Sequence, residues 1–459
     1  MRSPSQRYLW TGFSVLLVLV VLCLGWTWPV SSTEAKKQED TPPYTLQSSI
    51  EYAILRHPSL QSVDAMVSSA SDAIDASRAR YRPALNFSLQ LVDILQRDRN
   101  LFINGVFLSQ NNSQQFLDKF YTANLVFSVP LFIEGEFVSR TLPSERVSEE
   151  SYRGRQADYR LEREEVTYNV VRAFLGISQF TQGIQIAEEA VRLSEARYRA
   201  IREKFNLNLV SKNDLLLAEV EWASRKEELQ AEKNGRVQAL RDLTVQMGRD
   251  PQQPIEVRQD ERYPLLPDLL PIRDMIVYAH RHRAEIAAQE ASISVAQANV
   301  ELARSDRSPK VNFSSSYILL GDTLPIQSKE WQAVLSLGVP LFDSGYRQTL
   351  IAQSSSVLRA QEALLDKIKN NVTLEVQQVY LSIQNLANRR MVLDKQIQQL
   401  NEAFKLAEER YRQNMIPFSD LLGAQFNLMQ ARKAVVQSDY DQHLNYAVLR
   451  RAVGQAWTD

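Results

Sequence analysis

The segment VPLFIEG at residues 129–135 recurs as VPLFDSG at residues 339–345, and this repetition decides the fold. Outward from it, other short matches recur in the same order. They are Tyr-Ala at 52 and 278, Asn-Phe-Ser at 86 and 312, Arg-Tyr at 197 and 410, and Asp-Leu-Leu at 214 and 420. Ordered matches over most of a chain indicate an internal duplication.

The spacing between the copies shows where they differ. The offset is 226 residues at the Asn-Phe-Ser triplets (312 − 86) and 210 at the Val-Pro-Leu-Phe segments (339 − 129). The first copy therefore carries 16 extra residues (226 − 210), which we assign to the polar loop Asp98–Phe120. Five prolines between residues 251 and 271 predict a non-helical connector between the copies.

Each copy contains two segments in which apolar and polar side chains alternate. The four segments begin near Leu85, Ala123, Val311 and Trp331. A period of two over about 9–11 residues is typical of a transmembrane β-strand, apolar toward lipid and polar toward the lumen. The alternative is a half-buried strand of a soluble sheet, but four such strands on one repeating frame favour a membrane barrel. Pro130 and Pro340 are expected to end their strands.

Very long helices are expected after these strands. Residues 346–416 contain neither Gly nor Pro, and as one helix they would extend about 107 Å. The narrow apolar stripe in this stretch suits packing of helix on helix, with one face in water. Gly is only 14 of 459 residues, which agrees with a mostly helical chain.

The N-terminus predicts export from the cytoplasm. Arg2 and Arg7 precede an apolar run from Tyr8 to Trp28, which small residues follow, so we expect a signal peptide over residues 1–35. The alternatives are an uncleaved membrane anchor and, less consistent with the sequence, a lipoprotein signal. The only cysteine, Cys23, lies in this segment, so the mature chain would have no thiol chemistry.

These patterns predict a mainly α fold with a small β-barrel contribution, built from a duplicated helix–strand–strand–long helix repeat. We expect repeats at residues 36–248 and 271–459, with the connector at 249–270. Four strands cannot close a barrel, and open edges are costly in lipid. Two copies would supply eight strands and three would supply twelve, and the polar inward positions favour the wider, water-filled barrel.

The duplicated segments resemble the TolC family of outer-membrane efflux and secretion channels over nearly the whole mature chain. The resemblance implies a homotrimer with a twelve-stranded barrel in outer-membrane lipid and a helical barrel across the periplasm. It also implies a periplasmic adaptor and an inner-membrane pump as partners. The chain would then be the exit duct of a tripartite efflux pump or a type I secretion system. The alternative is an exported coiled-coil structural or adaptor protein.

The resemblance further implies site residues. Asp420, Asp214 and Tyr411 match the periplasmic pore entrance, where a ring of three Asp420 carboxylates would attract cations. The family's second acidic position is Gly423 here, and its gate arginine is Ile416. The alternative for both aspartates is a helix N-cap.

Two further groups of residues belong to these expectations. Asn208 and Asn414 stand where the family usually has Gly, in the turns between helices, and we expect a positive φ at both. Pro130, Gly135, Pro340 and Gly345 would mark the strand-to-helix transition.

Other classes of function find no support in the sequence. The net charge of −1 gives no basic field for nucleic acid. His57, His280, His282 and His443 are too scattered for a metal site, and no glycine-rich phosphate loop is present. We therefore expect neither a cofactor nor an enzyme.

Overall fold

The computed structural model describes residues 43–93, 102–103, 106–107, 119–253, 255–258, 270–321, 328–413 and 415–455. The expected signal peptide, Asn414 and most of the connector lie outside these ranges. The described residues belong to one compact unit that begins at Pro43.

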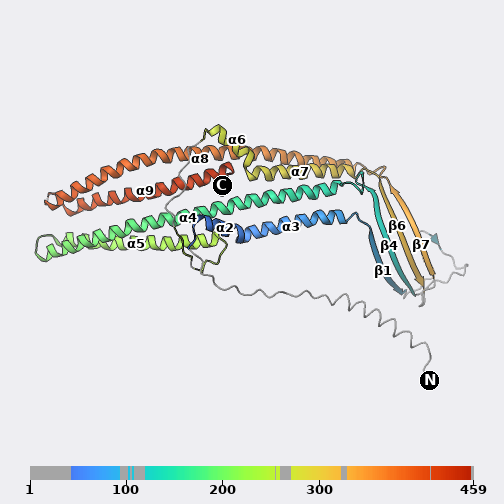
Figure 1. The fold of residues 1–459 in the computed structure, drawn as a ribbon, viewed down its shortest axis with the longest axis horizontal. Coiled ribbons are helices and arrows are strands. Elements are labelled where there is room, and N and C mark those ends of the chain that lie inside the picture. Colours follow the sequence, from blue (N-terminus) through green and yellow to red (C-terminus); the bar gives the residue numbers. More distant parts are fainter. Residues whose placement is uncertain are drawn as a thin grey trace, which may run out of the picture. The chain divides into compact units, whose positions relative to one another are not determined.

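The two halves contain the same order of elements (Figure 1). The first half has the helices α2 (Leu46–Arg56) and α3 (Pro58–Ala79), the strands β1 (Ala84–Asp93) and β4 (Lys119–Ile133), and the helices α4 (Pro143–Asn206) and α5 (Lys212–Gln246). The second half has α6 (Ile272–His282), α7 (Ala284–Ser305), β6 (Lys310–Gly321), β7 (Ser328–Gly338), α8 (Tyr346–Arg412) and α9 (Phe418–Val453). The predicted repeat of helix, two strands and long helix is confirmed.

Each copy opens with two helices where the sequence analysis expected one. His57 and Arg283 have extended backbone and separate α2 from α3 and α6 from α7. Pro58 explains the first break, because the residue before a proline is disfavoured in the helical conformation. The loop 98–120 also holds a short hairpin of β2 (Phe102–Ile103) and β3 (Val106–Phe107).

The four long strands form one antiparallel sheet in the order β1-β4-β6-β7. Leu85 pairs with Phe127 and Tyr317 with Trp331, so side chains of like polarity share a face. On the apolar face Phe87 and Trp331 are each 69% exposed. Among the described strands, β1 and β7 each have one long partner and leave their other edge open. An open apolar sheet of this kind needs both lipid and further strands.

The expectation that Pro130 ends its strand is wrong. Strand β4 continues to Ile133, and its register against β6 shifts between Pro130 and Phe132. Proline has no N–H to donate, and a bulge is one of the few places where a paired strand tolerates it. Pro340 does follow the end of its strand, since β7 ends at Gly338.

The helices continue the sheet as a single layer. Near the strands, α3, α4, α7 and α8 lie side by side in that order. Toward the other end, α4 pairs with α5 and α8 with α9, giving two helical hairpins that meet along α4 and α9 (Figure 1). Helix α4 has 64 residues and α8 has 67. Within the described ranges, no helix combines the length and apolar character that crossing a membrane requires.

Buried side chains are concentrated midway along this layer and at the hairpin tips. One cluster joins α2 to α4 and α5 around Val170 and Leu243, and a second joins α6 to α8 and α9 around Val376 and Ala452. A third cluster at the tips joins both hairpins. The narrow apolar stripe of each helix is thus used against a neighbouring helix, as the sequence predicted.

Candidate channel entrance and strand-to-helix junction

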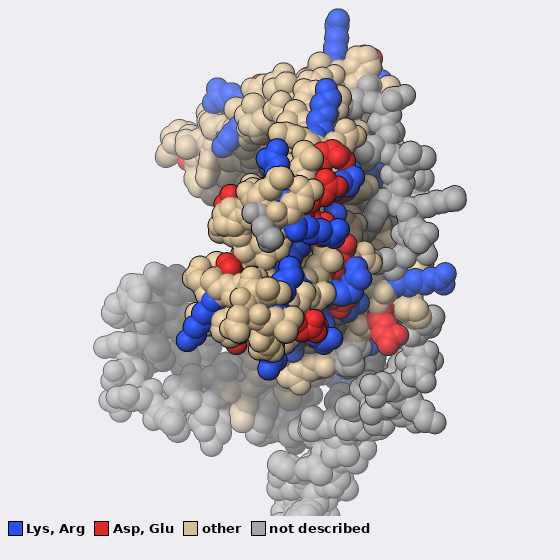
Figure 2. All heavy atoms as spheres, turned by 90° about the vertical axis from the view of Figure 1, so that its left-hand side faces the viewer, with Lys and Arg blue, Asp and Glu red and all other residues tan. Residues whose placement is uncertain are grey.

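The tips of the two hairpins pack against each other. Phe418 and Leu421 at the start of α9 are 2% and 1% exposed, and they contact Ile201 of α4 and Ala218 of α5 in the tip cluster. Around this apolar centre, acidic and basic side chains are interspersed, as the end-on view in Figure 2 shows. The four helix ends are therefore held as one body by a small hydrophobic core.

The turn between α4 and α5 has the backbone geometry expected of it. Asn208 has a φ of 59°, in the left-handed region, and its N–H donates to the carbonyl of Phe205 over 2.9 Å. The N–H of Leu209 bonds the carbonyl of Lys204, also over 2.9 Å. Asn tolerates this conformation better than other residues with a Cβ. Its counterpart Asn414 lies outside the described residues.

Asp214 takes part in a cap, although it is not the N-cap residue. That position belongs to Ser211, whose Oγ accepts a hydrogen bond of 3.1 Å from the Asp214 N–H. In return, Asp214 Oδ2 accepts from the Ser211 N–H (3.3 Å) and hydroxyl (2.8 Å). This reciprocal pattern is a capping box, which satisfies two N–H groups that the first turn leaves unpaired.

Asp420 does not cap its helix by a side-chain hydrogen bond. The N-cap of α9 is Pro417, and Asp420 is an exposed residue of the first turn. Its carboxylate accepts a hydrogen bond of 3.3 Å from the Ser419 hydroxyl, and no basic side chain of the described residues forms an ion pair with it. The N-cap interpretation is thus wrong for Asp420, whose carboxylate stays available to ions in solution.

Tyr411 lies between the two hairpins. Its ring centroid is 5.6 Å from that of Phe418, and Lys204 Nζ of α4 is 5.9 Å from the ring. Burial raises the pKa of the Tyr411 phenol, and the negative charge of Asp214 raises it further. Asp214 and Tyr411 are therefore electrostatic neighbours, although no hydrogen bond between them is found in the described part of the chain.

A buried polar cluster beside the tip was not among the predicted site residues. Arg197 of α4 donates to the side-chain oxygen of Gln425 of α9, which is 1% exposed. Glu221 of α5 faces the same guanidinium, and burial raises the pKa of its carboxyl while Arg225 and Arg197 oppose this. Burial also lowers the pKa of Arg197. We refer to Arg197, Glu221, Arg225 and Gln425 as the inter-hairpin polar cluster.

This cluster is only partly satisfied. Glu221 Oε1 and Arg225 Nε are 3.6 Å apart, an ion pair that is too long for a hydrogen bond. Within the described residues, Gln425 Nε2 and Trp222 Nε1 are buried without a hydrogen-bond partner. Each such group costs about 1–3 kcal/mol, so these unsatisfied atoms offset part of the stabilisation that the Arg197–Gln425 hydrogen bond contributes. The repeated Arg-Tyr pair marked Arg197 in the sequence, but nothing there indicated its partner.

At the other end of the helices, the duplicated segment ends in a strained turn in both copies. Glu134 and Gly135 have φ values of 55° and 81°, and Ser344 and Gly345 have 54° and 85°. In the first copy this turn joins β4 to the short strand β5 (Glu136–Phe137) before α4 begins, whereas Gly345 directly precedes α8. Two consecutive residues with positive φ match a type I′ turn, a common two-residue connection in β-hairpins.

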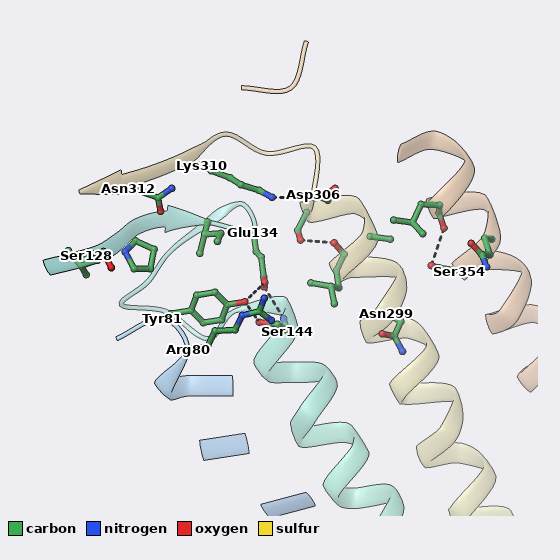
Figure 3. A pocket seen from close by; sticks show the side chains of 18 of the residues that line it. Arg80, Tyr81, Ser128, Glu134, Ser144, Asn299, Asp306, Lys310, Asn312 and Ser354 are labelled. Carbon is green, nitrogen blue, oxygen red and sulfur yellow. Dashed lines mark hydrogen bonds and ion pairs between the residues drawn. The ribbon is translucent and has the colours of Figure 1, made fainter. Parts of the chain in front are cut away.

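Glu134 connects three elements at this junction, as Figure 3 shows. Its Oε1 accepts a hydrogen bond of 2.7 Å from the Tyr81 hydroxyl, and its Oε2 accepts one of 2.9 Å from the Ser144 N–H at the start of α4. On the opposite side, Asp306 accepts from Lys310 over 2.9 Å and from Arg347 over 3.2 Å. The two carboxylates hold the helix ends against the strand bases.

The sheet and the helical layer together define an outer-membrane channel subunit of the TolC type. The family model described as "Outer membrane efflux protein" matches residues 49–249 and 275–455, so the chain belongs to that family. Family membership places the chain at the outer membrane, in agreement with the prediction from sequence.

Named relatives resemble part of the chain. The pyoverdine export outer membrane protein OpmQ of Pseudomonas putida is 27% identical over 180 residues, 38% of each chain. The cation efflux system protein CusC of Escherichia coli O157:H7 is 22% identical over 184 residues, 38% of this chain and 39% of CusC. These matches span about two fifths of the length of the relatives.

A solved structure resembles the fold over almost the whole chain. The open state of the Neisseria gonorrhoeae MtrE outer membrane channel superposes with a TM-score of 0.71 at 18% identity. The superposition covers 94% of this chain and 97% of MtrE. The predicted fold class is thus confirmed.

Proposed function

We propose that this protein is the exit duct of a tripartite efflux pump or type I secretion system. Substrate would pass from a periplasmic adaptor and an inner-membrane pump to the exterior. It would move along the tunnel that the helical layers of the assembled copies enclose. The observation that carries the proposal is the four-stranded sheet, whose two edges are open and whose apolar face is exposed. Such a sheet suits a segment of a larger barrel in lipid and does not suit an exported coiled-coil protein.

The same sheet supports assembly into a homotrimer. Because its strands alternate in direction, β7 of one copy can pair with β1 of the next in the antiparallel arrangement that the sheet already uses. Three copies would give twelve strands, and a barrel wider than eight strands has room for a water-filled lumen. The polar sheet face, with Ser128, Asn312 and Ser314, would line this lumen.

The hairpin tips would form the periplasmic entrance. Three symmetry-related Asp420 carboxylates, free of basic partners among the described residues, would surround the opening and attract cations. Asp214 and Tyr411 lie where the hairpins meet, beside the tip cluster. Asn208 and Asn414 would terminate the two hairpins, and Pro130, Gly135, Pro340 and Gly345 would mark the narrowing between barrel and helices.

The inter-hairpin polar cluster would hold this entrance closed. The family's gate arginine is replaced by Ile416, so the Arg197–Gln425 hydrogen bond is the charge-assisted link between the inner ends of α4 and α9. The buried atoms Gln425 Nε2 and Trp222 Nε1, which have no hydrogen-bond partner among the described residues, reduce the free energy needed to separate the hairpins. Arg197→Met should therefore raise the frequency of open events in planar bilayers, while Arg199→Met, on the same helix but exposed, should not.

Mass measurement and conductance test the proposal. Full-length protein from outer-membrane fractions is crosslinked, its mass is determined in detergent, and it is inserted into planar bilayers. A trimer with discrete conductance steps is expected. A stable monomer or dimer, or a trimer without conductance, contradicts the proposed function.

A further inference from the structure

A cavity of about 960 Å³ lies where the strands meet the helices, and we refer to it as the junction chamber (Figure 3). It is bounded by the bases of β4 and β6, by the last turns of α7 and by the first turns of α8. Its volume falls at the upper end of the roughly 300–1,000 Å³ typical of small-molecule sites. It is far from the inter-hairpin polar cluster and plays no part in the proposed entrance.

Apolar side chains form much of the chamber wall. Leu302 of α7 and Leu350 and Val357 of α8 line it. Ala296 and Ala303, both buried on α7, leave room where a larger residue would fill the space. A wall of this kind gives an organic molecule apolar surface to contact, and removing that surface from water favours binding.

The charged groups of the chamber are already paired or balanced. Both oxygens of Glu134 accept hydrogen bonds, from Tyr81 and Ser144, and Asp306 accepts from Lys310 and Arg347. Apart from Tyr81, the wall contains four ionisable side chains. Two are cations, Arg80 and Lys310, and two are the carboxylates of Glu134 and Asp306, so their formal charges cancel. The wall therefore carries no net formal charge that would attract a bare metal cation or a multivalent anion.

Neutral hydrogen-bonding groups, in contrast, are available. The side-chain amides of Asn299, Asn312 and Gln353 line the chamber without a hydrogen-bond partner among the described residues. Each amide both donates and accepts, so the three suit hydroxyl or amide groups of a ligand. Figure 3 shows Asn299 on α7 and Asn312 on the strand base on different sides of the chamber.

The chamber also lies on the side of the sheet that the proposed function assigns to the lumen. Ser128, Asn312 and Ser314, which line it, belong to the polar strand face. A molecule that passes from the helical section into the barrel would therefore pass the chamber.

We propose that the junction chamber is a transient binding site for small, uncharged amphipathic organic molecules with hydroxyl or amide groups. This proposal rests on the proposed function and assigns the transported substrate to that class. The apolar wall would hold the body of the molecule, and the three amides would bind its polar groups. A cargo of bare metal ions would pass without being held there.

Cysteine protection tests the proposal, because the only natural cysteine is Cys23 in the expected signal peptide. Val357→Cys places a reporter in the chamber wall, and Ser354→Cys gives a second reporter of nearly unchanged size. Val392→Cys is the matched control, because it replaces another exposed valine of α8, 64% exposed against 49% for Val357, that lies about 50 Å away along the helix. Maleimide labelling rates are measured on full-length trimers in lipid nanodiscs, with the neutral probe 4-nitrophenyl β-D-glucoside and the anionic probe 4-nitrophenyl phosphate.

At twice its dissociation constant, the glucoside should slow labelling of Val357→Cys and Ser354→Cys about threefold, since the free fraction is 1/(1 + [L]/Kd). The phosphate should leave both rates unchanged, and neither probe should protect Val392→Cys. Adding Gln353→Met, which keeps the side-chain length and removes the amide, should abolish most of the protection. Equal protection by both probes, protection by neither, or protection that survives Gln353→Met together with Asn299→Leu overturns the proposal.

The conductance of the same variants separates this proposal from the proposed function. If the trimers conduct in planar bilayers and the glucoside gives no protection, only the chamber assignment is wrong. If they form no conducting trimer while the unsubstituted chain also forms none, the proposed function itself is wrong.

Discussion

Arg283 donates a hydrogen bond of 2.7 Å to the backbone carbonyl of Arg451, joining the break between α6 and α7 to the last turn of α9. Both guanidinium groups also contact Glu375 of α8, over 2.8 and 3.4 Å. Arg451 reaches α4 as well, through Glu165 at 2.9 Å. Arg283 is only 5% exposed, so this network fixes the break between α6 and α7 to α4, α8 and α9 midway along the layer.

Loss of the Arg283 cation should destabilise the protein. Arg283→Met removes the hydrogen bonds to Arg451 and Glu375. The partly buried Glu375 carboxylate then keeps only one of its two cationic partners, which should lower the free energy of unfolding by roughly 3 kcal/mol. The free energy of unfolding, measured with guanidinium chloride on the purified assembly, checks this. Arg281→Met, at an exposed position in the last turn of α6, should change it little, and equal effects of the two substitutions would contradict the role of the network.

The left-handed turn at Asn208 makes a second prediction. Asn208→Gly should be nearly neutral, whereas Asn208→Val should cost about 1–2 kcal/mol because a β-branched residue resists a φ of 59°. Leu207→Val is the control, since the neighbouring φ of −91° accepts Val. Thermal unfolding of the three variants measures the effect, and equal losses for Val at both positions would refute it.

The exposed carboxylate of Asp420 should control ion selectivity. Asp420→Ala should reduce cation preference and block by trivalent cations, because a ring of three charges at the opening would be lost. The electrostatic attraction of cations to the ring should also weaken as the salt concentration rises, because the site is exposed to water. Reversal potentials in asymmetric salt measure the preference. Asp366→Ala, at an exposed position of α8 away from the hairpin tips, is the control, and unchanged selectivity in Asp420→Ala would exclude the pore-ring role.

The junction should show a pH dependence that originates at Asp306. The hydrogen bond from Lys310, supported by the charges of Lys310 and Arg347, holds the pKa of this carboxyl below its ordinary 3.8. A lowered pKa in the folded state means that the contribution to stability is complete above pH 3.8 and is lost as pH falls through the lowered value. Since the group is partly exposed, this contribution is at most about 1 kcal/mol.

The comparison of Asp306→Asn with the unsubstituted chain tests this dependence. The variant should unfold at a lower temperature at pH 7, and the difference should shrink once the pH falls below 3.8. Asp366→Asn, which has no ion pair among the described residues, should show no such pH-dependent difference. A difference between Asp306→Asn and the parent that is constant from pH 7 to pH 3 would show that charge at Asp306 is not its cause.

Local sequence was sufficient for the long strands and long helices of this fold. The alternation around Leu85 and Trp331 predicted strands because side chains of a strand point to opposite faces at every second residue. The absence of Gly and Pro after Tyr346 predicted a helix that the structure shows to be 67 residues long. The positive φ of Asn208 was expected from the family resemblance, because Asn stands where the family usually has Gly.

The tertiary structure alone decided which distant side chains meet. Arg197 and Gln425 are 228 positions apart, and their contact depends on how two hairpins pack. The same is true of Arg283 with Arg451 and of the amides around the junction chamber. Pro130 shows the effect within one strand, since pairing with β6 carried β4 past a residue that ends many strands. Periodicity reports which face of an element is apolar, whereas the partner of each side chain is determined by packing in three dimensions.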